Sequence, residues 1–351
     1  MENLKLGFVP IGKFVFSHID AMKYKKQIEE KLKRWNINYV SMDKILPDGM
    51  VRDQKHVEVV IEFLNKEKVD GVFIPHCNFG TEGAAGMIAK KSGVPVLLWG
   101  PRDEEPLEDG TRLRDTLCGL FATSKVLHKL NVPFTYIENC RIEDIAFKEG
   151  VEKFMSVISV VKEFKNMRLG QIGSRIDFFW TTIINESELL EKFGIEILPI
   201  DIVDFIKQVK ENSEKNKRKY IEEFKKTKEK INFSGFENEN SILNLFSMRD
   251  VMFEIANKEK INAYAIQSFM SICKELGVMV EFAAAMVSDE GIPVAAETDI
   301  HGAISSIILQ ASSFNKEKVF LADLTIRHPK NDNAVLLWHC SSPISMIDKN
   351  C

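Results

Sequence analysis

The chain has 351 residues, 45% of them hydrophobic, so it can bury a large core and should form two or three domains. Its net charge of −4 offers no basic surface for nucleic acid, and no apolar run reaches the about 20 residues that span a bilayer. The six cysteines are scattered without a C-x-x-C pair, which is typical of reduced thiols. We expect a cytoplasmic protein with neither nucleic-acid nor membrane partners.

The first 165 residues alternate predicted strands and helices, which is typical of a doubly wound parallel sheet. Strands are predicted at 4–10, 38–42, 71–75, 94–99 and 134–137, and helices at 19–35, 56–66, 82–91, 112–130 and 148–165. Ligands bind in loops at strand C-termini in such sheets, and the loops 76–82 and 100–105 occupy such positions. No G-x-G-x-x-G follows the first strand, so a dinucleotide site is not indicated.

The same alternation continues from residue 166. Strands are predicted at 167–173, 195–200, 261–266, 292–296, 318–322 and 334–340, and helices at 186–193, 241–257, 282–287 and 300–311. The segment 201–230 mixes Lys and Glu at helical spacing, which favours a long exposed helix or a helix pair over a basic nucleic-acid patch. The predicted class is therefore α/β, with two doubly wound, Rossmann-like domains containing parallel sheets.

Two acids each follow a short apolar run. Glu297 follows 292–296, and Asp323 comes 26 residues later, after 318–322. Acids at the ends of strands tend to lie at the C-terminal edge of a sheet, where α/β proteins place their sites. Two such acids can bind one hard divalent metal or share acid/base work. The alternative is that Glu297 caps the next helix and that Asp323 sits in a turn.

Sequence motifs along nearly the whole chain resemble, in order, those of the L-fucose/L-arabinose isomerase superfamily. The matches are at 14–18, 77–82, 97–103, 113–122, 134–140, 288–293, 296–299, 322–323 and 337–340. Among its members the chain is most similar to the fucose-isomerase-like branch. The resemblance implies an aldose–ketose isomerase with a divalent metal, usually manganese. It also implies two α/β domains, a C-terminal β-rich domain, and assembly into a homo-oligomeric trimer or hexamer.

The resemblance assigns Glu297 and Asp323, from the A-x-E-x-D and A-D motifs, as metal ligands and as the proton-transfer pair. Hard oxygen ligands suit Mn²⁺ or Mg²⁺ better than Zn²⁺. The third family ligand is a histidine deep in the C-terminal domain, and this sequence departs from the family by stopping at Cys351. His339 is not at that position; it either touches the metal or is a structural histidine beside a strand. We predict domains at 1–165, 166–312 and 313–351, the last being the start of a truncated C-terminal domain.

Other residues are candidates for contacting the sugar. Gln267, at the end of its predicted strand, is a possible hydrogen-bond donor to sugar hydroxyls or a helix cap. His301, in the first turn of a predicted helix, meets either substrate or solvent. Asp299 is expected to be the N-cap of that helix.

The resemblance also implies that the N-terminal domain of a neighbouring subunit forms a second wall of the pocket. Asn78, Trp99 and Arg102 are the main candidates for that wall, together with Thr81 and Glu82. The alternative is that Trp99 belongs to the core and that Arg102 pairs with a nearby glutamate.

Three functions compete. The first is a metal-dependent isomerase that acts on a fucose- or arabinose-like monosaccharide through an enediol, alone or with a separate C-terminal chain that supplies the missing histidine. The second is a sugar-binding or regulatory protein of the two-domain cleft type, without catalysis. The third is the product of a disrupted gene, whose exposed edge would make it aggregate.

Overall fold

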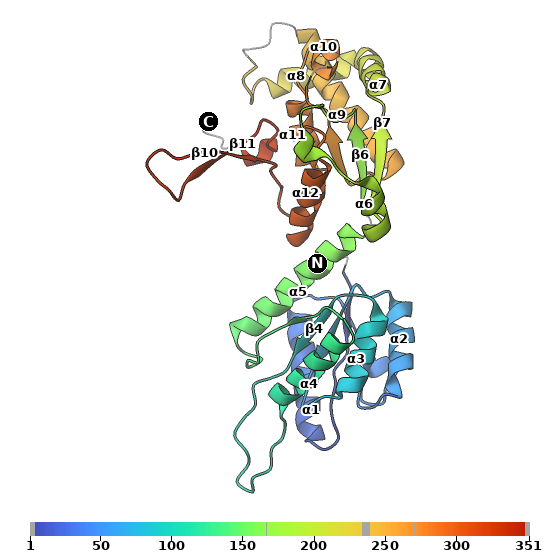
Figure 1. Ribbon diagram of the computed structural model, residues 1–351, viewed down its shortest axis with the longest axis vertical. Coiled ribbons are helices and arrows are strands. Elements are labelled where there is room, and N and C mark those ends of the chain that lie inside the picture. Colours follow the sequence, from blue (N-terminus) through green and yellow to red (C-terminus); the bar gives the residue numbers. More distant parts are fainter. Residues whose placement is uncertain (1–3, 166, 234–238, 270, 348–351) are drawn as a thin grey trace. The chain divides into compact units, whose positions relative to one another are not determined.

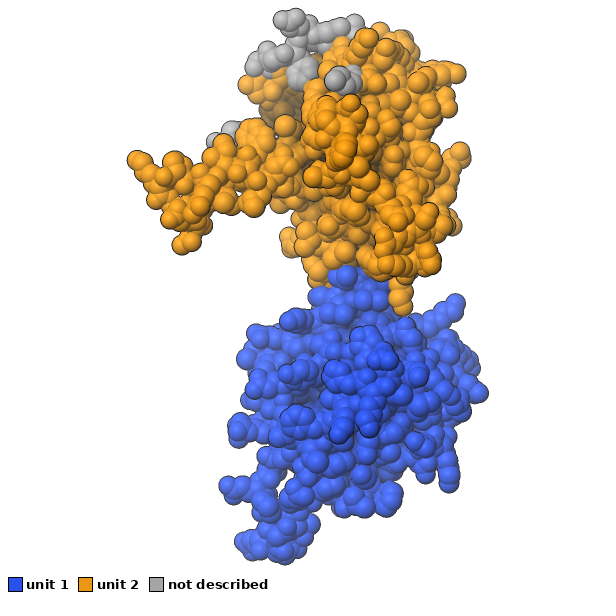
Figure 2. Space-filling model, in the orientation of Figure 1, with its two compact units in different colours: residues 1–162 blue, residues 163–351 orange. Residues whose placement is uncertain are grey.

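The computed structural model describes residues 4–165, 167–233, 239–269 and 271–347. The chain divides into two compact units, residues 1–162 and 163–351 (Figure 2). Each unit contains its own parallel sheet, so the predicted class with two doubly wound domains is confirmed. The domain boundaries at 165 and 312 stay a prediction.

Unit 1 is built on a five-stranded parallel sheet with the order β2-β1-β3-β4-β5. Its strands are β1 (Leu6–Phe8), β2 (Tyr39–Ser41), β3 (Gly71–Pro75), β4 (Val96–Trp99) and β5 (Thr135–Tyr136). Every residue of β3 and β4 is buried, as expected for strands covered by helices on both faces. The strand order reverses between β1 and β3, so the ligand-binding edge of this sheet is the end where these strands stop.

The helices of unit 1 are α1 (His18–Arg34), α2 (His56–Glu67), α3 (Glu82–Ser92), α4 (Thr116–Lys129) and α5 (Ile145–Phe164) (Figure 1). The prediction that α4 begins at residue 112 is wrong. The carboxylate of Asp103 accepts hydrogen bonds from the backbone N–H groups of Thr116, at 2.8 Å, and Leu117, at 3.2 Å. These are donors of a first helical turn, so the cap supplied by a distant loop fixes the start of the helix.

Unit 2 contains a four-stranded parallel sheet with the order β7-β6-β8-β9. The strands are β6 (Arg168–Ile172), β7 (Glu196–Ile200), β8 (Ala263–Ile266) and β9 (Val294–Ala295). The helices are α6 (Glu186–Phe193), α7 (Ile202–Lys215), α8 (Lys217–Thr227), α9 (Glu239–Glu259), α10 (Ser271–Leu276), α11 (Glu281–Asp289) and α12 (Ile300–Ser312). Short 3-10 turns occur at Met42–Lys44, Trp180–Thr182 and Ile344–Met346.

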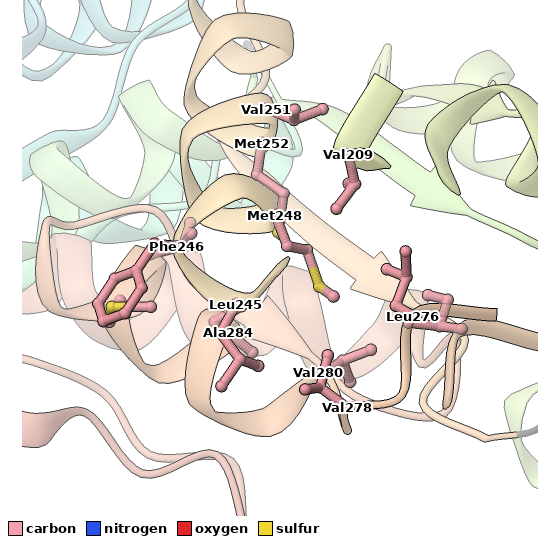
Figure 3. Close-up of a cluster of buried hydrophobic side chains, with 14 of the residues drawn as sticks. Val209, Leu245, Phe246, Met248, Val251, Met252, Leu276, Val278, Val280 and Ala284 are labelled. Carbon is pink, nitrogen blue, oxygen red and sulfur yellow. The ribbon is translucent and has the colours of Figure 1, made fainter. Parts of the chain in front are cut away.

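The charged segment 201–230 forms the predicted helix pair, α7 and α8. Asp201 caps α7, since its carboxylate accepts from the backbone N–H groups of Val203 and Asp204. The pair is not exposed on every side, because most of its apolar residues, including Phe205, Val209 and Phe224, are buried in the cluster that also contains residues of the long helix α9. Figure 3 shows Val209 of α7 in the same cluster as Met248 and Met252 of α9.

A two-stranded antiparallel hairpin, β10 (Asp323–Arg327) and β11 (Val335–Trp338), extends from the helices of unit 2 (Figure 1). The predicted strand at 318–322 is therefore wrong, and the strand begins at Asp323 instead. The apolar residues before it pack rather than pair: Leu321 lies against the core that contains Ile300 and Ile304 of α12. Every residue of β10 and β11 is exposed.

No helix in the described part of the chain is both long enough and apolar enough to cross a bilayer.

A histidine is completely buried at the ligand-binding edge of the first sheet. His76 follows β3, and its Nε2 lies 2.9 Å from the hydroxyl of Thr123 on α4. The Nδ1 atom has no hydrogen-bond partner among the described residues. Burial lowers the pKa of His76 to about 4, because the charged imidazolium would be poorly solvated there.

This depressed pKa predicts an acid-sensitive stability. Below its ordinary pKa of about 6.5, the imidazole binds a proton in the unfolded chain but not in the folded one. The free energy of unfolding should therefore fall as the pH drops from about 6.5 toward 4, by about 2 kcal/mol between pH 7 and pH 5. Urea unfolding at the two pH values measures the effect. The variant His76→Gln should lose this part of the pH dependence, and an unchanged slope would show that another group causes it.

Candidate functional site

The loops after β6, β8 and β9 converge at the C-terminal edge of the second sheet. The carbonyl oxygen of Ser174, after β6, accepts hydrogen bonds from Nε2 of Gln267 at 2.9 Å and from Oγ1 of Thr298 at 3.4 Å. Gln267 directly follows β8, and Thr298 lies just beyond β9. The strand order reverses between β6 and β8, and this is where ligands bind in doubly wound sheets.

Gly173 permits this convergence. Its φ of +79° lies in the left-handed region, where a side chain is strained. A Cβ atom there would lie 3.0 Å from a side-chain atom of Ile202 and 3.1 Å from Cβ of Gln267. Any residue larger than glycine would therefore push against the Gln267 side chain.

Glu297 stands at this edge with a partly buried carboxyl group. Burial is the largest cause of its raised pKa, and the negative charges of Asp323 and Asp299 raise it further, while His339 lowers it. The alternative of a helix-capping role for Glu297 is wrong. Asp299 is the N-cap of α12, as predicted, and accepts from the N–H of Gly302 at 2.9 Å.

Asp323 is the first residue of β10 and is exposed. It lies opposite Trp338 in the ladder, so His339, the next residue of that strand's chain, leaves the hairpin at the same end. The alternative of a turn position for Asp323 is therefore wrong as well.

His339 has a defined hydrogen-bonding state. Its Nδ1 accepts the backbone N–H of Cys340 at 3.0 Å. In the neutral tautomer that accepts this bond, Nε2 carries the proton and is a donor. Contact of His339 with a metal stays a prediction.

The donor set fits a hard divalent cation in part. The negative charge of Asp323 contributes to the raised pKa of Glu297, and a bound cation would relieve this repulsion between the two carboxylates. Their oxygens are the ligands that Mn²⁺ and Mg²⁺ prefer. The described residues do not assemble three His, Cys, Asp or Glu side chains in a metal-binding group. Glu297 and Asp323 as ligands thus stay predictions.

The amide of Gln267 is held at Nε2, and its Oε1 is buried without a hydrogen-bond partner in the described parts of the chain. Such an oxygen can accept a hydroxyl, so the predicted contact with a sugar would include an acceptor as well as a donor. His301 is exposed in the first turn of α12. Substrate contacts of both residues stay predictions.

The three candidates in unit 1 have different surroundings. Oδ1 of Asn78 accepts from the N–H groups of Lys13 and Phe79, and its Nδ2 donates to the carbonyl of Lys13, so the amide fastens the loop after β1. The Trp99 side chain is completely buried, and its ring packs 4.3 Å from that of Phe147. Arg102 is exposed. Their substrate contacts also stay predictions, but Asn78 and Trp99 already have structural roles.

Thr81 also fastens loops, because its hydroxyl donates to the carbonyl oxygen of Gly12 at 2.9 Å. Of the two glutamates that the alternative offered to Arg102, Glu104 and Glu105, Glu104 pairs with Arg114 at 2.8 Å.

Sequence reasoning missed Ser174, Ser268 and Thr298, which connect the three loops of the second sheet. Ser174 and Ser268 follow predicted strands within a few residues, and this strand-end position was the available signal.

A cavity of about 1110 Å³ lies elsewhere in unit 2, among α8, α9, α11 and residues 340–347. Glu281 is in its lining, with Oε2 buried and unpaired among the described residues. Glu297, Asp323 and Gln267 do not line it, so we place the candidate site at the sheet edge, where the polar groups converge.

The chain is similar to a family of sugar isomerases and to individual sulfoquinovose isomerases. The family described as fucose/sulfoquinovose isomerase, N-terminal domain, matches residues 7–165. A sulfoquinovose isomerase of Priestia megaterium is 23% identical over 342 residues, which are 97% of this chain and 74% of the relative. One of Alkalicoccus urumqiensis is 24% identical over 344 residues, 97% of this chain and 73% of the relative.

These similarities support the resemblance to the fucose-isomerase-like branch. The chain also overlaps a periplasmic solute-binding protein of an ABC transporter from Actinobacillus succinogenes with bound D-allose. That structure is 11% identical, covers 90% of this chain and 93% of its own, and has a TM-score of 0.21. This overlap is too low to support any statement on fold or function.

The burial of Trp99 predicts a role in stability. Trp99→Ala should lower the free energy of unfolding by about 3–5 kcal/mol, because it leaves a large cavity beside Phe147. Urea unfolding measures this loss. Arg102→Ala is the matched control, since Arg102 is exposed three residues away and its removal should leave stability unchanged. A Trp99→Ala protein of full stability but raised KM would instead favour the predicted substrate wall.

Proposed function

We propose that this chain is a metal-dependent aldose–ketose isomerase whose chemistry takes place at the edge formed by the loops after β6, β8 and β9. The main support is the position of Glu297. It is a partly buried carboxyl group with a raised pKa, it lies near a second carboxylate, and it follows a strand beside the switch point of the sheet. The family match over residues 7–165 and the sulfoquinovose isomerases among the relatives support a sugar isomerase.

Isomerisation of an aldose to a ketose moves a proton between C2 and C1 through a cis-enediol. One carboxylate removes the proton from one carbon, and a second acid/base group serves the other carbon. In our proposal Glu297 and Asp323 have these two roles. A raised pKa suits a carboxylate for this work, because it increases its strength as a base near neutral pH.

We assign Glu297 and Asp323 as the ligands of a divalent cation, Mn²⁺ or Mg²⁺. When bound, the cation supplies electrostatic stabilisation to the negative charge that develops on the substrate oxygens. Gln267 would orient the sugar, since its unpaired Oε1 accepts a hydroxyl hydrogen bond. His339 would donate to a substrate oxygen from Nε2, because Nδ1 is already occupied by the N–H of Cys340.

We propose sulfoquinovose as the first substrate to test, since the relatives that align over nearly the whole chain are sulfoquinovose isomerases. L-Fucose and L-arabinose follow, as the sugars that sequence analysis predicted. The expected trimer or hexamer, and a separate C-terminal chain, are also proposals. Either would bring further side chains to the same edge.

The decisive measurement is ketose formation from sulfoquinovose, L-fucose and L-arabinose with Mn²⁺ present. We expect turnover of at least one sugar, lost on addition of EDTA. Glu297→Gln should lower kcat by about 100- to 10,000-fold, because it removes the general base and a metal ligand.

Glu290→Gln is the control, since it makes the same change at an exposed position of unit 2 and should keep wild-type activity. A Glu297→Gln protein with full turnover and unchanged Mn²⁺ affinity would refute the assigned role. Tight sugar binding without metal or turnover would favour the sugar-binding alternative.

A further inference from the structure

Two consecutive residues at the proposed catalytic site have an unusual backbone conformation. Glu297 has a φ of +59° and Thr298 a φ of +57°. Side chains other than those of Gly, Asn and Asp rarely occupy this left-handed region, because Cβ crowds the neighbouring carbonyl oxygen. Such conformations persist only where the surroundings impose them. Some specific contact must therefore hold the chain in this turn.

Three hydrogen bonds hold the turn. The N–H of Glu297 donates to the hydroxyl oxygen of Ser268 at 3.1 Å, and the N–H of Thr298 donates to the carbonyl of Ile266 at 3.0 Å. The Thr298 hydroxyl donates to the carbonyl of Ser174 at 3.4 Å. Ser268 and Thr298 are only 1% and 3% exposed. Water cannot readily replace these partners, so the bonds are costly to lose.

We infer that Ser268 and Thr298 are positioning residues, which fix the direction of the Glu297 side chain by fastening its strained backbone to the loops after β8 and β6. The inference rests on the proposed function, because it gives Glu297 the catalytic role. The hydroxyl groups of Ser268 and Thr298 do not touch the substrate. Both act through the backbone that carries the carboxylate.

The direction of the Cα–Cβ bond follows from φ, so a turn that relaxes to an ordinary conformation moves the carboxylate away from its place relative to Asp323. A displacement of about 1 Å in a catalytic group can cost about 100-fold in rate. Ser268→Ala leaves the N–H of Glu297 buried and without its acceptor, which favours this relaxation. Sugar binding through Gln267 would be unaffected, so the loss should appear in kcat and not in KM.

The test compares Ser268→Ala with Ser268→Thr, which retains a hydroxyl, and with Ser306→Ala. Ser306 is a matched control: it is 6% exposed, and its hydroxyl donates to the Gly302 carbonyl within α12 at 2.9 Å. We expect Ser268→Ala to lower kcat by about 10- to 100-fold with KM within about twofold. Ser268→Thr should restore much of kcat, and Ser306→Ala should match the wild type.

Hydrogen exchange supplies a readout that needs no activity. Peptides covering residues 294–300 should exchange at least several-fold faster in Ser268→Ala, and their exchange should be unchanged in Ser306→Ala. Thr298→Val, which removes the second hydroxyl at nearly constant volume, replaces Ser268→Ala if that variant does not fold. In Thr298→Val, as in Ser268→Ala, kcat should fall and the exchange of residues 294–300 should become faster.

Unchanged kcat and unchanged exchange in Ser268→Ala would overturn the inference. Equal losses in Ser268→Ala and Ser306→Ala would also overturn it, since they would reflect general destabilisation. Failure of a folded Ser268→Thr to recover activity would do the same. Failure of the proposed function is a different outcome. In that case the wild type turns over no sugar, or Glu297→Gln retains full turnover, whatever the Ser268 variants do.

Discussion

The parallel pairing of β6 with β8, and of β8 with β9, is the constraint on which the candidate site depends. Parallel strands end at the same edge, so three chain segments far apart in sequence leave the sheet side by side. The Ser174 carbonyl then joins the segments by accepting from Gln267 and Thr298, which are 93 and 124 residues away along the chain. Because every polar group at this edge depends on the register of these strands, the core beneath the sheet sets the geometry of the site.

Burial has opposite consequences in the two units. At His76 it favours the neutral imidazole, and the structure places that ring where it contacts Thr123. At Glu297 it favours the protonated carboxyl group, and nearby negative charges increase the effect. The first arrangement lowers stability in acid, whereas the second, in our proposal, raises the strength of a catalytic base. The same physical effect, the loss of hydration around a charge, thus affects stability at His76 and the pKa of a candidate catalytic group at Glu297.

Much of the fold could be predicted from the sequence because apolar runs and charged helical faces are local patterns. β3 at 71–75 and α6 at 186–193 have the predicted bounds. The strand before Asp323 could not be predicted correctly, because Leu321 packs against the core that contains residues of α12, and only tertiary contacts distinguish packing from pairing. The position of Glu297 after a strand was predictable, but the left-handed turn was not. Glu and Thr do not signal such a turn, which depends on Ser268, 29 residues away along the chain.

The proximity of Asp323 to Glu297 depends on whether the exposed hairpin β10–β11 is ordered. Glu297 is anchored to a sheet, whereas Asp323 belongs to a two-stranded element whose residues are exposed on both faces. An isolated two-stranded hairpin is only marginally stable in water. The free-energy cost of bringing the two carboxylates together therefore includes the cost of ordering the hairpin. Any surface that covers Leu324 and Trp338, which are 73% and 60% exposed, would stabilise the ordered hairpin and so offset that cost. In our proposal, catalytic activity therefore depends on the folding equilibrium of this one small element.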